Sequence, residues 1–155
     1  MIPRRFVGEL ATFTALRTLD LVDPAEVVKW AEDLVRGGES NPLLVDLSAL
    51  PARDASAVDT RLTAISSESG IGELSELQVG QLAAADIARQ LNDGLLEPID
   101  AARAIWKVAT RAPASEFALR QFIGLSSEWD DDPGRRNIYD EEIRSLALSA
   151  ADWKL

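Results

Sequence analysis

The sequence of 155 residues contains no cysteine and no histidine. The lack of cysteine excludes disulfides, thiolate nucleophiles, Cys-based zinc sites and thiol redox motifs. The lack of histidine excludes Ser-His-Asp triads, imidazole acid–base chemistry and most transition-metal sites. Together these absences rule out most familiar enzyme mechanisms, so we expect no cofactor.

Long apolar runs are also missing. No stretch approaches the ~20 apolar residues that a membrane span needs. The first thirteen residues carry Arg4 and Arg5, but Glu9 interrupts the apolar run and no small-residue cleavage site follows, so the sequence predicts no signal peptide. Together with the absence of cysteine, this favours a cytoplasmic protein without a membrane partner.

Basic side chains are scarce. Sixteen Lys and Arg face 26 Asp and Glu, for a formal charge of −10, and the pI is about 4.5. A nucleic-acid partner would need clustered Lys and Arg to meet its phosphates, so the charge argues against one. It favours solubility and, for a macromolecular partner, a basic one.

Apolar residues recur every three to four positions nearly everywhere, which is typical of amphipathic helices. We predict an all-α protein, a compact bundle of seven to eight short helices without a sheet. Residues 1–155 fit a single domain, with a soft internal break at 66–72, where the sequence reads SSESGIG. The short, proline-introduced helices look like those of small bacterial proteins, a likeness that assigns no residue a role.

Proline and glycine mark the expected helix boundaries, because proline fits the first helical position and glycine the end. Phe117 is expected to face the core, and residues 129–137, WDDDPGRRN, read as a loop. The helices are expected at about 4–20, 24–36, 42–50, 54–66, 75–92, 98–112, 117–128 and 138–153.

The acidic run in that loop raises a calcium hypothesis. With Asp130 as the first position of a calcium loop, Asp132 and Glu141 fall at the third and twelfth positions. Gly134 and Arg135 occupy positions that need an oxygen ligand and a glycine. We therefore predict no metal site, while loosely held magnesium stays open.

The same region is the predicted binding surface. A tryptophan flanked by acids has the composition of an interface anchor, although Trp129 also fits an inward position in the last turn of its helix. Trp30 has the same ambiguity. We call the predicted partner-binding residues the acidic surface. It comprises Trp129, Asp130, Asp131, Asp132, Tyr139, Asp140, Glu141 and Glu142.

A basic stripe is expected on the helix that follows Pro98. Arg103, Lys107 and Arg111 are spaced by four residues and so share one face. Two interpretations stay open: an anion or partner site, or a face that is solvated or paired within the protein.

No phosphate-binding loop and no nucleophile elbow is present. We therefore expect a non-enzymatic acidic interaction module, whose narrowest version is an inhibitor or immunity-type protein that binds a basic partner. Two alternatives remain: a carboxylate- or Mg-dependent enzyme, and a structural helical scaffold or oligomerisation unit.

Overall fold

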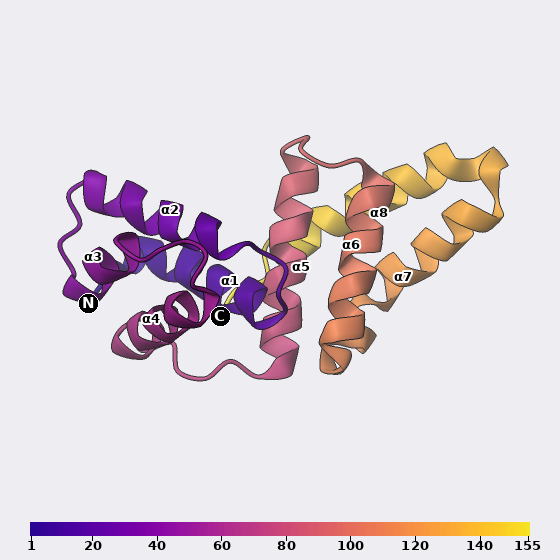
Figure 1. Cartoon of the computed structure of the whole chain (residues 1–155). Helices are drawn as coiled ribbons and strands as arrows, with labels where there is room; N and C mark the ends of the chain where they lie inside the picture. Colours follow the sequence, from indigo (N-terminus) through magenta and orange to yellow (C-terminus); the bar gives the residue numbers. More distant parts are fainter. The chain divides into compact units, whose positions relative to one another are not determined.

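A computed structural model describes all 155 residues (Figure 1). Eight α-helices, 75% helical content and the absence of strands confirm the predicted all-α bundle. None of the helices combines the length and apolar character that a membrane crossing requires. The chain divides into two compact units, Met1–Leu74 and Ser75–Leu155, just after the predicted break at 66–72. That residues 1–155 behave as one domain stays a prediction.

The first unit packs four α-helices around one apolar core. Its helices begin where local chemistry predicts, because the side chains of Asp23, Asn41 and Asp54 accept hydrogen bonds from N–H groups of the first turns. Pro24 and Pro42 occupy first helical positions. The elements are η1 (Arg4–Phe6), α1 (Val7–Thr18), α2 (Pro24–Arg36), α3 (Pro42–Ser48) and α4 (Ala55–Glu68). Fully buried side chains are Leu10, Val27, Leu44, Leu47 and Val58.

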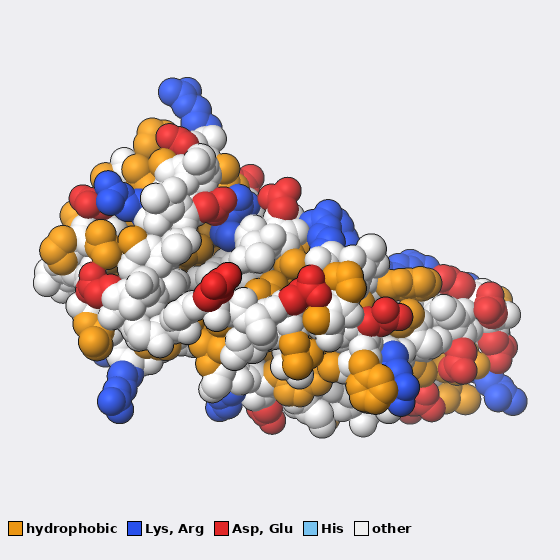
Figure 2. All heavy atoms as spheres, turned by 90° about the horizontal axis from the view of Figure 1, so that it is seen from below, with side chains coloured by type: hydrophobic (Ala, Val, Ile, Leu, Met, Phe, Trp, Pro, Cys, Tyr) orange, Lys and Arg blue, Asp and Glu red, His pale blue; other side chains and the backbone are white.

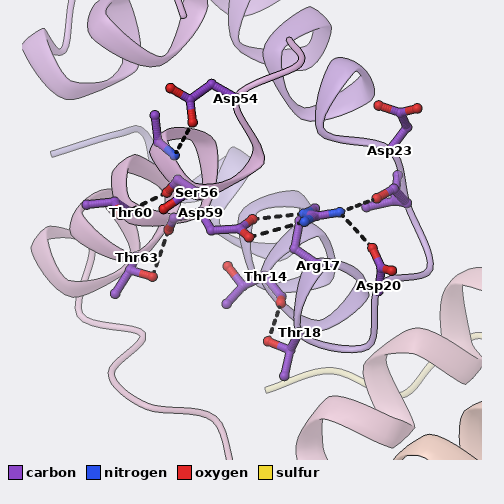
Figure 3. A network of polar contacts seen from close by, with 12 residues as sticks. Thr14, Arg17, Thr18, Asp20, Asp23, Asp54, Ser56, Asp59, Thr60 and Thr63 are labelled. Carbon is purple, nitrogen blue, oxygen red and sulfur yellow. Dashed lines mark hydrogen bonds and ion pairs between the residues drawn. The ribbon is translucent and has the colours of Figure 1, made fainter. Parts of the chain in front are cut away.

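Arg17 holds three parts of this unit together (Figure 3). Its side chain is only 9% exposed. Nε and Nη2 donate to the two carboxylate oxygens of Asp59 on α4, at 2.8 and 3.1 Å. Nη1 donates to the carbonyl of Val22 at 2.7 Å and to Asp20 at 3.3 Å. The guanidinium therefore joins α1, the turn that follows it, and α4.

The second unit is built around α5, which packs against every other α-helix of the unit (Figure 1). The first turn of α5 has a capping box, in which Ser75 accepts from the Gln78 N–H and the Gln78 side chain accepts from the Ser75 N–H. The elements are α5 (Glu76–Asn92), α6 (Pro98–Arg111), η2 (Pro113–Ser115), α7 (Glu116–Asp131), η3 (Pro133–Arg135) and α8 (Arg136–Ala150).

Gly80 allows α5 to approach η2 closely. A Cβ built on Gly80 would lie 2.2 Å from the Ser115 Oγ and 2.3 Å from its Cβ. Ser115 is fully buried and its hydroxyl donates to the carbonyl of Ala112. Because rotation of the serine cannot move its Cβ, any larger residue at position 80 requires the backbone to shift.

The inward position predicted for Phe117 is wrong, since this residue is 76% exposed. The buried side chains of α7 include Leu119, Phe122 and Ser126, which follow one another at helical spacing. Phe117 precedes Leu119 by two residues, and this offset places it on nearly the opposite side of the helix.

Gly80→Ala is expected to destabilise the protein by about 1–3 kcal/mol, the usual range for overpacking a tight contact. The matched control is Gly124→Ala on α7, where an added Cβ meets nothing within 4 Å. This control should stabilise the protein by about 0.4–1 kcal/mol, because alanine restricts the unfolded chain. Chemical denaturation followed by circular dichroism measures both changes. Equal effects of the two substitutions would contradict the close approach at Gly80.

Arg17→Lys should lower the free energy of unfolding by about 1.5–3 kcal/mol, because lysine lacks the planar fork that bonds both oxygens of Asp59. Arg36→Lys is the control, since Arg36 is 75% exposed and pairs only with Asp33 of its own helix. The control should change stability by no more than about 0.5 kcal/mol. Thermal and denaturant unfolding measure both variants, and an equally small change for Arg17 would disprove its role.

Candidate functional site

The predicted acidic surface lies where α7 ends and α8 begins. The prediction of a loop over residues 129–137 is wrong, because α7 continues to Asp131 and α8 already starts at Arg136. Pro133 disfavours the helical conformation at the residue directly before it. Asp132 accordingly leaves the helical region (φ −129°, ψ 77°). Only a short 3₁₀ turn is left between the two helices.

Trp129 is half-buried in the last turn of α7 and clamps that helix to α8. Its indole Nε1 donates to an Asp140 carboxylate oxygen at 3.0 Å. The Arg136 Nε donates to the carbonyl of Trp129, and the guanidinium lies 3.8 Å from the ring centroid. Arg103 of α6 lies 5.4 Å from the same centroid. Trp129 thus takes part in contacts within the unit. Trp30 of the first unit is likewise half-buried, and its indole nitrogen bonds Glu9 at 2.6 Å.

Two further acids of the surface have partners inside the unit. Asp130 accepts a hydrogen bond from the Arg103 Nη2 at 2.7 Å. Asp132 accepts one from the Tyr139 hydroxyl at 3.1 Å and lies 3.8 Å from the Arg135 Nε. These contacts fix the turn between α7 and α8 and neutralise part of its charge.

The remaining three acids of the acidic surface have no such partners. Asp131, Glu141 and Glu142 are exposed, and no Lys or Arg lies within ion-pair distance of them. The predicted surface therefore separates into side chains that hold the α7–α8 turn and three carboxylates that remain available to solvent or a partner.

The predicted basic stripe of α6 is partly used within the protein. Arg103 pairs with Asp130 and lies against Trp129, so it belongs to the same structure as the acidic surface. Lys107 and Arg111 are exposed on the rest of the helix face. The i, i+4, i+8 spacing shows the shared face, but it gave no sign of the pairing across 27 residues.

Sequence reasoning missed a groove between α7 and α8, beside the acidic surface. The groove has a volume of about 460 Å³ and is open to solvent. The α7 positions are spaced as one helix stripe and the α8 positions as another, so the two helices form its opposite walls. The one sequence feature that could have indicated this groove is a glycine in the middle of a predicted helix. The groove is lined by Gln121, Gly124, Leu125, Glu128, Glu142, Ser145 and Leu146.

A second hollow, of about 600 Å³, is formed by residues of α4 in the first unit, which Figure 3 labels. Ser56, Asp59, Thr60 and Thr63 line it. The threonine hydroxyls donate to carbonyls of their own helix, and Asp59 is held by Arg17. The two threonine hydroxyls and the Asp59 carboxylate are therefore committed to the fold.

Tyr139 offers a direct probe of the turn, because it is the single tyrosine of the chain. Burial of its ring and its hydrogen bond to Asp132 raise its pKa above the ordinary 10.0. Because the folded state favours the neutral phenol, stability should fall as the pH rises from 10.0 through this raised pKa. We expect Asp132→Asn to move the pKa back toward the ordinary value. Absorbance titration of the tyrosinate measures both proteins, and identical titration curves would contradict the Tyr139–Asp132 bond.

No group of three or more acidic side chains is arranged to hold a metal ion. The chain matches no family model, no curated protein and no solved structure.

Proposed function

We propose that the protein is a non-enzymatic interaction module that binds a basic protein partner. One observation carries the proposal: Asp131, Glu141 and Glu142 are exposed and unpaired at the end of the α7–α8 hairpin. Residues 128–142 contain seven acidic and two basic side chains. Figure 2 shows acidic side chains gathered at the right of the view, over the end of α7 and the start of α8.

The internal contacts of the turn support this proposal. Trp129, Arg136 and Asp140 keep the turn in one geometry, so the exposed carboxylates sit on a fixed frame. A backbone that is already fixed loses little conformational entropy when a partner binds. A concentrated negative field also speeds the encounter with a positive surface.

The narrowest version of the proposal is an inhibitor or immunity-type protein that neutralises a cationic protein. A small helical chain with a charge of −10 suits that task, because fast association matters for an inhibitor and charge complementarity raises the association rate.

The double variant Asp131→Lys, Glu141→Lys should slow association with the basic partner by about tenfold or more at low salt, because steering contributes 10–10³-fold to association rates. The partner is captured on the immobilised protein from a lysate of the source cells and identified by mass spectrometry. Its binding kinetics are then measured at several salt concentrations.

The control is Glu32→Lys, Glu73→Lys, which makes the same charge change at exposed positions of the first unit. It should preserve most of the association rate. A partner that binds both double variants equally, or whose association rate does not depend on salt, would count against the proposed surface.

A further inference from the structure

We infer that the α7–α8 groove is the docking site for a cationic amphipathic helix of the basic partner. This inference rests on the proposed function and names where and how the partner binds. It follows from the shape of the groove, from the glycine in its wall and from the distribution of charge along it.

The shape fits a helix better than a small molecule. The groove is open to solvent and runs between two helices. Pockets for small molecules bury 70–90% or more of the ligand surface, which an open groove does not do. An amphipathic helix, by contrast, lays only its apolar face into such a groove. The buried Leu125 and the partly buried Leu146 give the groove an apolar lining for that face.

Gly124 keeps the groove open at a cost to the helix. Glycine within a helix is about 1 kcal/mol less favourable than alanine. The backbone at Gly124 is helical, and an added Cβ would meet nothing within 4 Å. Packing therefore requires glycine at position 80 but not at position 124, where its effect is to leave room in the α7 wall.

Charge is distributed unevenly along the groove. Glu128 and Glu142, its charged lining residues, lie toward the turn, and the unpaired Asp131 and Glu141 continue the negative charge beyond them. Arg120 and Arg144 lie on the same two helices but do not line the groove.

Exposed apolar side chains lie one helical turn beyond the other end, where Gln121 and Ser145 line the groove. Phe117 precedes Gln121 by one helical turn and is 76% exposed, while Leu148 follows Ser145 by one turn and is 66% exposed. The Arg120 guanidinium lies 4.3 Å from the Phe117 ring centroid, so positive charge is already present beside that ring. The docked helix should therefore place its basic residues near the α7–α8 turn and its apolar residues toward Phe117.

The test uses a synthetic helical peptide with leucine along one face and lysine clustered at one end, labelled for fluorescence anisotropy. Gly124→Leu should weaken its binding at least tenfold, because the leucine side chain occupies the groove. Gly8→Leu is the matched control, since a Cβ at this exposed glycine of α1 also meets nothing within 4 Å. The control should bind like the unchanged protein, and circular dichroism checks that both variants remain helical.

A second peptide has the same composition in scrambled order, so that its leucines no longer share one face. Weaker binding of the scrambled peptide supports the inference. Equal binding of both peptides, or no effect of Gly124→Leu, overturns the groove as docking site. The proposed function survives that result if Asp131→Lys, Glu141→Lys still weakens binding, and it fails as well if this variant has no effect.

Light scattering of the unchanged protein tests whether a second copy of the chain, rather than a different partner, occupies the groove. A monomer supports a different partner. An oligomer that Gly124→Leu dissociates, with Gly8→Leu still associated, would show that the groove binds another copy and would overturn the inference.

Discussion

The second unit depends on the contact between Gly80 of α5 and Ser115 before α7. With no Cβ at position 80, the buried serine lies against the α5 backbone. The Ala114 N–H donates to a Glu76 carboxylate oxygen at 2.7 Å, which ties the same 3₁₀ turn to the start of α5. This turn sets where α7 begins and in which direction it runs. The position of Gly124 in the groove wall follows from that direction.

At the other end of α7, cationic side chains decide which acids stay available. Arg103 and Arg136 lie against Trp129, and Arg103 also pairs with Asp130. Pairs at the surface contribute only about 0–1 kcal/mol each, but together with the indole–Asp140 bond they hold α6, α7 and α8 in register. The acids that remain unpaired take no part in these contacts. The same short stretch of chain thus holds the three helices together and carries the proposed binding surface.

Helix boundaries could be read from the sequence because they depend on adjacent residues. Asp23 and Pro24 start α2, and the glycines at 37 and 38 end it. Each of these signals acts only on residues that are a few positions away in the sequence. The turn after Trp129 was misjudged because an acidic run with Pro and Gly is compatible both with a loop and with a helix that ends just before Pro133. The pairing of Arg103 with Asp130 and the groove arise when distant helices meet, and no local pattern encodes them.

Acidic side chains differ in what they contribute to the fold, and this difference favours a binding role for α8. In the first unit, Asp23 and Asp54 cap helices and Asp59 holds the buried Arg17. Those carboxylates stabilise the fold. Glu141 and Glu142 follow one another in α8, and neither has a cationic partner within ion-pair distance. Carboxylates that pair with no cation of the fold, beside a helix glycine that packing does not require, are the pattern expected where function takes precedence over the fold.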